Sequence, residues 1–465
     1  MVENSQSPLF LLLFFPLFLG FYFNPFFRGR KFRNSVLLVF SLLFYAWGEP
    51  IFVFLMIASI IFTWFVAIKL DDSKTGKKTW LRIGIGSHIL LLFVFKYVSF
   101  LAREFGLLLQ KDYSGINIAL PIGISFFTFQ LMSYLFDIYY GKAKAQKSVA
   151  SLALYIALFP QLIAGPIVRY ASIEKEINGR KESMDGFIAG MERFIYGLGK
   201  KVLIANYVAS IADEVFSASG DVSVLTMWLG AVCYTIQIYF DFSGYSDMAI
   251  GIGRMCGFTF PENFNYPYSA VSVTDFWHRW HMSLTSWFRD YVYVPLGGNR
   301  VGKARWIGNL FVVWALTGFW HGANWTFPAW GLLYFCVLVL EKTTGFADKL
   351  GVLARPYTLI VVALAWTVFR ADSIGTAVHY WAIMFGLTDV PMVDERFWGL
   401  LGACKIILPI ALVLSFPVWP RLKEQLAGKV LLESIIEPIT IVCIFLLSVM
   451  QVVSASYNPF IYFNF

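Results

Sequence analysis

Charged side chains are scarce in this chain of 465 residues, where Asp, Glu, Lys and Arg together make up 14%. A water-soluble globular domain carries about 25% charged residues, so the composition argues against a soluble enzyme. Hydrophobic residues make up 58% of the chain, and the mean hydropathy is +0.65. The aromatic share of 18% suits a protein that lies in lipid, because amphipathic rings collect at membrane interfaces.

Cysteine is also rare, with five residues that stand singly in apolar segments: Cys233, Cys256, Cys336, Cys404 and Cys443. No CxxC spacing occurs, so neither a disulfide framework nor a thiolate metal site is indicated. Free cysteines behave as small buried hydrophobes, and we expect these five in the core. The chain also lacks a Ser/Pro linker, an internal repeat and a soluble segment, which predicts one integral-membrane domain over residues 1–465.

Acidic residues are outnumbered, since 37 Lys and Arg against 29 Asp and Glu give 37 − 29 = +8. In so apolar a chain this excess indicates basic loops at a membrane face and argues against nucleic-acid binding. Short basic loops lie at Arg28–Arg33, Lys74–Lys78, Lys142–Lys147 and Arg300–Arg305, and we expect them on the cytoplasmic side. The acidic Asp213–Asp221 loop and the tail Ser454–Phe465 are then expected outside.

Long runs without a charge predict the architecture, because a helix needs about 20 apolar residues to cross a bilayer. The chain is expected to be an all-α polytopic membrane protein with about ten to twelve membrane helices. Ser35–Ile68 predicts a helical hairpin that turns at Gly48–Pro50. The other long runs are Pro8–Phe27, Ile116–Phe136, Ser148–Val168, Val222–Phe240, Trp306–Leu340 and Pro438–Phe465.

Proline and glycine interrupt the apolar stretch Phe159–Arg169, at Pro160 and at Gly165–Pro166. Broken backbone at membrane depth persists only where protein or a water-filled cavity satisfies its polar groups. A re-entrant segment therefore fits this stretch better than a plain span.

Polar residues follow an uncharged run in Tyr239–Asp247, which carries Asp241 and Asp247 together with several hydroxyls. An ionisable residue in a membrane segment indicates a functional site by default. The alternative is a structural ion pair between these carboxylates and Arg254, Arg279 or Arg289.

Two histidines lie in the segment Thr274–Tyr291. At about 100° per residue, one continuous helix would place His281 on a stripe with Trp277, Leu284, Phe288 and Tyr291. Arg279, Ser283, Ser286 and Asp290 would share the opposite face. His278 falls at the boundary, where it meets solvent or lipid headgroups. A lone histidine on an apolar stripe is more often a satisfied core residue than a catalyst.

His321 lies near the middle of Trp306–Leu340, which spans 35 residues without a formal charge. The adjacent glycines Gly318 and Gly322 let another backbone or a substrate approach closely. A neutral imidazole in apolar surroundings can act as a base, so His281 and His321 suit general-base activation of an alcohol. Zinc bound by His278, His281 and His321 is an alternative. The stripe turns His278 away, and no HExxH glutamate is present, so no metal is expected.

Several blocks of the sequence resemble the signature of bacterial membrane-bound O-acyltransferases. They include Asn263–Tyr268, Phe276–Leu284, Trp287–Gly298 and Gly318–Gly322, and also Leu120–Phe129, Leu162–Pro166 and Phe460–Phe463. Within that superfamily the chain is most similar to the membrane proteins of alginate and other exopolysaccharide O-acetylation. The blocks cover nearly the whole chain and are specific for the family, but they give only weak evidence on which acceptor is used.

The resemblance implies a helical ring with a central tunnel, in which an acyl thioester meets an acceptor hydroxyl. The essential histidine of the family corresponds to His321 and its second histidine to His281. His278 is doubtful as a catalyst. The residues expected to bind substrate are Tyr239, Asp241, Ser243, Trp277, Trp280, Arg289, Trp320 and Asn324.

The expected function is O-acetylation of a secreted polysaccharide at the bacterial inner membrane. Acetyl-CoA would be the donor, with no permanently bound cofactor. An extracytoplasmic subunit would accept the acetyl group, and lipid would surround the enzyme. D-alanyl transfer to teichoic acid is the alternative within acyl-transfer chemistry. A flippase for lipid-linked sugars, another transporter, and a catalytically silent scaffold are alternatives from other classes.

Overall fold

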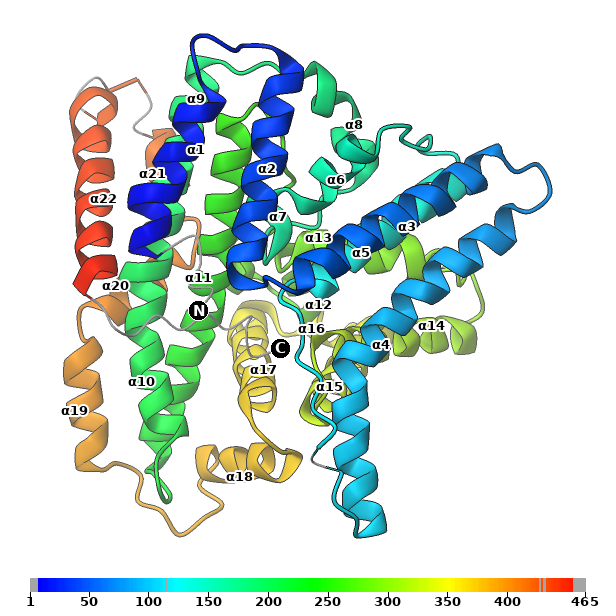
Figure 1. Ribbon diagram of the computed structural model, residues 1–465. Coiled ribbons are helices and arrows are strands. Elements are labelled where there is room, and N and C mark those ends of the chain that lie inside the picture. The colour runs from blue at the N-terminus through cyan, green and yellow to red at the C-terminus, as the bar shows by residue number, and fades with distance from the viewer. Residues whose placement is uncertain (1–6, 114, 426–427, 430–431, 455–465) are drawn as a thin grey trace. The chain divides into compact units, whose positions relative to one another are not determined.

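The computed structural model describes residues 7–113, 115–425, 428–429 and 432–454, and every regular element in these ranges is helical (Figure 1). The predicted all-α class is confirmed. Two compact units interleave along the chain. Unit 1 comprises residues up to Phe194 together with Ser246–Pro261, and unit 2 comprises Ile195–Tyr245 together with residues from Glu262 onward. The expectation of one domain stays a prediction.

Unit 1 begins with short helical segments and continues through two long hairpins. Its helices are η1 (Phe10–Phe14), α1 (Phe15–Tyr22), α2 (Arg30–Gly48), α3 (Phe52–Asp72), α4 (Lys77–Leu109), α5 (Ile124–Tyr139), α6 (Val149–Ala157), α7 (Phe159–Leu162), α8 (Tyr170–Gly179), most of α9 (Met184–Gly199) and the end of α11 (Val224–Met255). The predicted hairpin is confirmed, because α2 ends at Gly48 and α3 begins two residues after Pro50. The run Ile116–Phe136 is helical only from Ile124, since Pro121 and the left-handed Gly123 (φ 73°) precede the helix.

The interrupted stretch after α6 is buried, as the prediction requires. Leu158 separates α6 from α7, and residues 163–169 leave the helix. Side chains satisfy the freed backbone groups: Ser41 Oγ accepts from Phe159 N at 3.1 Å, and Tyr155 OH donates to Val168 O at 2.8 Å. Broken backbone therefore lies inside protein, where its polar groups find partners.

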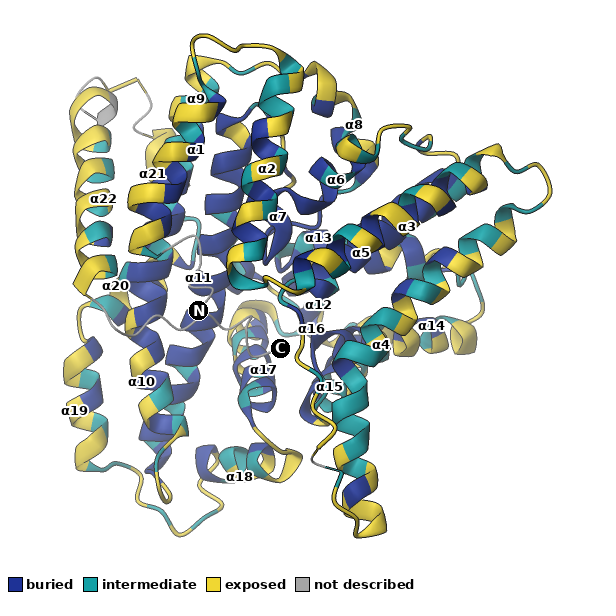
Figure 2. Cartoon of the chain, viewed as in Figure 1, coloured by how far each residue is buried: buried dark blue, intermediate teal, exposed yellow. Residues whose placement is uncertain are grey.

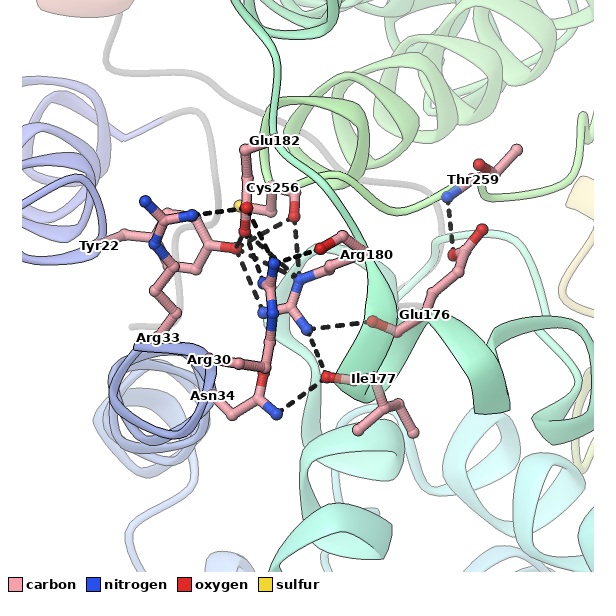
Figure 3. A network of polar contacts seen from close by, with 10 residues as sticks. All are labelled: Tyr22, Arg30, Arg33, Asn34, Glu176, Ile177, Arg180, Glu182, Cys256 and Thr259. Atoms are coloured by element: carbon pink, nitrogen blue, oxygen red, sulfur yellow. Dashed lines mark hydrogen bonds and ion pairs between the residues drawn. The ribbon is translucent and has the colours of Figure 1, made fainter. Parts of the chain in front are cut away.

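A second feature of unit 1 is a charged cluster around Glu182 (Figure 3). Glu182 accepts hydrogen bonds from Tyr22 OH, Arg30 and Arg33 at 2.5–2.9 Å, and its side chain is 8% exposed. The buried Arg180 donates to Cys256 O at 3.0 Å and lies 3.8 Å from Glu182. Burial raises the pKa of Glu182, but the hydrogen bonds from Arg30 and Tyr22 outweigh it and hold the pKa at about 2.

Unit 2 is the longer of the two units. Its helices are the end of α9, η2 (Lys200–Ala205), α10 (Asn206–Phe216), most of α11 (Val224–Met255), η3 (Pro267–Ser269), α12 (Val273–Arg279), α13 (Met282–Phe288), η4 (Arg289–Tyr293), α14 (Lys303–His321), α15 (Thr326–Thr344), α16 (Phe346–Lys349), η5 (Gly351–Leu353), α17 (Ala354–Arg370), α18 (Ile374–Met384), α19 (Glu395–Cys404), α20 (Ile407–Leu414), α21 (Val418–Gln425), η6 (Leu432–Ile436) and α22 (Glu437–Ser454). Helix α14 packs along α15, and α15 packs on α12 and α17.

Five described helices are long and apolar enough to cross a membrane: Phe52–Asp72, Lys77–Leu109, Val224–Met255, Gly351–Arg370 and Ser434–Ser454. A sixth span results if α19 and α20, which meet at 63°, are counted as one. This number is below the ten to twelve expected, because the structure divides several runs. Trp306–Leu340, for example, becomes α14 and α15.

Burial differs sharply among these helices (Figure 2). The most apolar window of α11 is 83% buried, whereas that of Ser434–Ser454 is 6% buried. Cys233, Cys256 and Cys404 are buried as expected, but Cys336 and Cys443 are exposed. The expectation of core packing is therefore wrong for these two, because their helices turn apolar faces outward. The predicted outer tail Ser454–Phe465 lies outside the described ranges except for Ser454, the last residue of α22.

Candidate functional site

The histidine-bearing segment is two helices rather than one. Helix α12 ends at Arg279 and α13 begins at Met282, and His281 between them has φ 43° and ψ 53°. This left-handed conformation is uncommon for a residue with a Cβ atom, so the predicted continuous helix Thr274–Tyr291 is wrong. The predicted stripe is nevertheless buried throughout, at Trp277, His281, Leu284, Phe288 and Tyr291. Ser283, predicted on the opposite face, is also buried.

Asn263 holds the imidazole of His281. His281 Nδ1 lies 3.0 Å from Asn263 Oδ1, and the same oxygen accepts from Ser283 Oγ at 2.8 Å. The ring of Phe242 packs against His281 with centroids 4.7 Å apart. His281 is 1% exposed and lies outside the candidate membrane spans, and burial lowers its pKa to about 3. The ring is therefore neutral at physiological pH.

His321 is the last residue of α14 and is 9% exposed. Glycines bring α14 and α15 close together there: a Cβ on Gly318 would lie 2.6 Å from Phe327 O, and a Cβ on Gly322 would lie 2.2 Å from the Phe327 ring. The close approach predicted from the glycines is confirmed, with α15 as the neighbouring backbone. The tight hairpin places His321 against Trp330 and Phe369, at ring distances of 5.0 and 5.1 Å.

Trp320 connects the two histidines. Its ring centroid lies 6.1 Å from that of His281 and 4.9 Å from that of His321. The structure thus brings both predicted histidines to one indole, although 40 positions separate them in the chain. Both imidazoles are buried and surrounded by aromatic rings, so a reaction there would proceed with little water.

Unsatisfied donors accompany this aromatic cluster. Trp277 Nε1, Trp330 Nε1 and Tyr334 OH are buried and have no hydrogen-bond partner among the described residues. Their rings touch one another, with centroids 5.0–5.6 Å apart. Buried polar groups are nearly always hydrogen bonded. A group of donors without acceptors is suited to a ligand oxygen.

His278 and Arg289 lie outside this cluster. His278 is exposed, as predicted, and Arg289 is exposed and paired with Asp290 at 2.7 Å. The assignment of Arg289 to substrate binding stays a prediction. Within the described ranges, no group of three or more His, Cys, Asp or Glu lies close enough to hold a metal ion.

The carboxylates of α11 form ion pairs, but with partners that the sequence did not suggest. Asp241 binds Lys201 at 2.5 Å, with both side chains almost fully buried, and Asp247 binds Arg193 at 2.8 Å. The predicted partners Arg254, Arg279 and Arg289 are therefore wrong. The alternative that both carboxylates form ion pairs is confirmed. Arg279 instead pairs with Asp275 at 2.9 Å, one helical turn away. Substrate binding by Asp241 stays a prediction.

The remaining residues predicted to bind substrate differ in the contacts that their side chains already make. Tyr239 and Trp280 pack together at 6.2 Å, and Trp280 reaches Trp366 at 5.0 Å. Ser243 Oγ is buried without a hydrogen-bond partner in the described part of the chain. Asn324 uses its amide locally, since Nδ2 donates to Asp372 O at 2.9 Å and Oδ1 accepts from Thr326 N at 3.2 Å.

Sequence reasoning missed Asn263, Trp330, Tyr334 and Phe369. Asn263 lies in the block Asn263–Tyr268, which resembles the family signature, but nothing in the sequence predicts its contact with His281, 18 positions later. Trp330, Tyr334 and Phe369 sit in apolar runs, where aromatic residues usually indicate packing. The packing of α15 and α17 against the end of α14 places Trp330 and Phe369 beside His321, and Tyr334 contacts Trp330.

Comparison with known proteins identifies the group to which this chain is related. A model of the membrane-bound O-acyltransferase family matches residues 142–369. A protein named probable alginate O-acetylase AlgI, from Pseudomonas putida, is 36% identical over 493 residues, covering 99% of each chain. The chain belongs to the membrane-bound O-acyltransferase family.

Two further relatives differ in the acceptors that their names state. A peptidoglycan O-acetyltransferase of Helicobacter pylori is 35% identical, covering 83% of this chain and 80% of its own. A teichoic acid D-alanyltransferase of Bacillus subtilis is 31% identical, covering 57% of this chain and 67% of its own. The matched family region contains both His281 and His321. As a member of the family, this chain is a membrane-embedded acyltransferase.

Proposed function

We propose that this acyltransferase moves an acetyl group from acetyl-CoA to an acceptor that O-acetylates a secreted polysaccharide, in a bacterial inner membrane. The observation that carries the proposal is the pair of buried histidines on one indole, Trp320. The name and near full-length similarity of the Pseudomonas putida relative support acetyl as the group transferred.

The proposed reaction uses the imidazole of His321 as general base. The acceptor hydroxyl gives its proton to the ring, and its oxygen attacks the thioester carbonyl carbon. The tetrahedral oxyanion is stabilised by nearby donors, for which Trp330 Nε1 and Tyr334 OH are candidates. The C–S bond then breaks, and the thiolate takes the proton back from the imidazolium. His281, neutral and buried, would orient or accept from one of the reacting groups.

The donor would approach along α14 from the cytoplasmic side. The basic residues Arg300, Lys303 and Arg305 lie at the start of this helix, where they would attract the phosphates of CoA. His321 ends the same helix, and 18 residue steps at 1.5 Å place it about 27 Å from the basic end. The thioester would therefore reach the imidazole while the nucleotide stays at the basic end.

The acceptor is proposed on the far side, presented by a separate extracytoplasmic subunit. The similarity to a peptidoglycan O-acetyltransferase makes peptidoglycan a second candidate for the final acceptor. D-alanyl transfer is the other candidate for the acyl group, favoured by the relative from Bacillus subtilis. That similarity covers only 57% of this chain, whereas the acetylase covers 99%.

The test uses the purified protein in lipid nanodiscs with acetyl-labelled acetyl-CoA. We expect label to leave CoA when an acceptor hydroxyl is supplied, and less from a D-alanyl thioester. A transporter or scaffold would leave the thioester intact, which would contradict the proposal.

Proteoliposomes of one known orientation test the direction. Acetyl-CoA supplied only at the face of Arg300–Arg305 should load an acceptor enclosed on the opposite face. If both substrates must share one face, transfer across the bilayer is wrong and one-sided acyl transfer remains.

A further inference from the structure

The break between α12 and α13 is held by a segment far from it in the chain. Asn265 N donates to Arg279 O at 3.0 Å, and Met282 N donates to Asn263 O at 2.9 Å. These two bonds fix residues 263–265 along the turn that carries His281. The side chain of His281 makes no capping bond to α13, although His281 is the N-cap residue. The Asn263 side chain reaches Ser283 N at 3.3 Å instead and replaces the missing cap.

The same side chain determines which nitrogen of His281 carries the proton. Backbone N–H groups only donate, so the Asn263 atom that faces Ser283 N must be the carbonyl oxygen. An amide oxygen only accepts, and therefore His281 Nδ1, 3.0 Å from that oxygen, must be the donor. In a neutral imidazole the other nitrogen, Nε2, then has the lone pair.

Asn263 is itself built into the core. It is 1% exposed, and its Nδ2 has no hydrogen-bond partner among the described residues. Two rings pack on His281: Phe242 from α11 and Trp320 from α14. Burial lowers the pKa of His281 and keeps its ring neutral. The amide oxygen of Asn263 thus makes a buried polar contact that orients this ring.

We propose that Asn263 is a positioning residue for acyl transfer, which holds His281 as the Nδ1–H tautomer and directs the basic Nε2 toward the reacting groups. The inference rests on the proposed acetyl transfer, in which His281 takes part. A side chain that only capped α13 would affect folding, whereas one that sets the tautomer also changes the pH dependence of the rate.

Three variants separate these roles. Asn263→Ala removes the acceptor, and we expect kcat to fall by up to about 100-fold with a smaller change in KM. Asn263→Asp keeps an acceptor at the same place but adds a negative charge, which favours the imidazolium. Its activity should recover at alkaline pH, with the acidic limb of the rate profile moved to higher pH. Asn265→Ala is the control, because Asn265 is exposed and its hydrogen bonds to Arg279 use its backbone N–H and carbonyl, which the substitution keeps.

A spectroscopic measurement tests the tautomer without any turnover. The protein has five histidines, and ¹⁵N spectra of the ring nitrogens in nanodiscs can be assigned by difference with His281→Ala. Wild-type protein should give a protonated Nδ1 and an unprotonated Nε2 for His281, and Asn263→Ala should give a mixture.

The outcomes distinguish the two proposals. Wild-type protein that transfers no acetyl group contradicts the proposed function, while the ring-nitrogen spectra still decide the role of Asn263. Wild-type turnover and an unchanged spectrum in Asn263→Ala would overturn the positioning role. An unshifted pH profile in Asn263→Asp would also overturn it and leave Asn263 as a helix cap.

Discussion

Two buried polar clusters, one in each unit, use their hydrogen-bonding groups in opposite ways. Three arginines and a tyrosine surround the carboxylate of Glu182, and Cys256 O accepts a further hydrogen bond from Arg180 (Figure 3). Around His321, indole and phenol donors are buried without partners among the described residues. The first cluster is charged and connects segments of unit 1. The second is uncharged and lined by aromatic rings.

The difference separates stabilisation from function. Buried charges are tolerated where they are paired and hydrogen bonded, so the Glu182 cluster needs no further ligand to account for it. Buried donors without acceptors cost about 1–3 kcal/mol each, and a protein retains them where a ligand supplies the acceptor. Variants of the first cluster should therefore affect stability, and variants of the second should affect turnover.

The largest effect is expected for His321→Ala. Loss of a general base costs about 10²- to 10⁴-fold in rate, while the fold should persist because the ring lies at a helix end. His321→Gln, which retains most of the side-chain volume, guards against a packing defect. Labelled acetyl-CoA turnover in nanodiscs is the measurement, and His379→Ala, an exposed histidine paired with Asp221, is the control. Near-normal turnover in both His321 variants would exclude it as the base.

The next effect concerns stability in the Glu182 cluster. Glu182→Gln removes the charge shared by Arg30 and Arg33, and we expect a loss on the order of 2–3 kcal/mol. This is below the ~3–5 kcal/mol typical of a fully buried pair, because the two arginines are partly exposed. The apparent melting temperature in detergent should fall, while turnover of the protein that remains folded stays within about twofold of wild type.

The pH dependence of that stability has a definite sign. The pKa of Glu182 is depressed to about 2 in the folded protein, against 4.5 ordinarily. The stabilisation is therefore complete above about pH 4.5 and is lost as the pH falls toward 2. In Glu182→Gln this part of the acid sensitivity should be absent. The exposed carboxylate of Asp348 offers the control Asp348→Asn, and an acid profile that does not differ between Glu182→Gln and wild type would contradict the assignment.

A smaller effect separates the two neighbouring histidines. His281 is buried against Phe242 and Trp320, whereas His278 is exposed. His281→Ala should lower turnover about 10- to 100-fold, within the range for a positioned acid or base or somewhat below it, and His278→Ala should change it little. Equal losses would indicate that both rings serve one metal site, which a metal assay on the purified protein would reveal.

The sequence predicted those parts of the molecule that depend on local pattern. The charge-free runs gave the helical membrane class, Gly48–Pro50 gave the hairpin turn, and Pro160 with Gly165–Pro166 gave the buried interruption. The burial of His281 and the exposure of His278 also followed from periodicity. These features are local because each depends on residues within a few turns of one another.

The sequence could not predict what distant segments impose. His281 adopts a left-handed conformation because residues 263–265 supply the hydrogen bonds, and periodicity alone extends a helix through that break. Asp241 pairs with Lys201 rather than an arginine that follows it in the chain. Trp330 and Tyr334 reach the histidine cluster only because Gly318 and Gly331 allow α14 and α15 to pack closely.

The smallest expected effect comes from one hydroxyl and sharpens the comparison most. Tyr334→Phe removes a buried OH that has no partner in the described ranges, so the melting temperature should stay the same or rise. If the hydroxyl binds the acyl oxygen, kcat/KM should fall about 2- to 10-fold, the equivalent of one net hydrogen bond.

Tyr155→Phe is the matched control, because Tyr155 OH donates to Val168 O at 2.8 Å in the interrupted stretch of unit 1. Its removal leaves a buried carbonyl unsatisfied, so stability should fall while turnover of the folded protein is retained. Loss of stability without loss of turnover in Tyr334→Phe would assign that hydroxyl to the fold and leave Trp330 Nε1 as the candidate donor to the oxyanion.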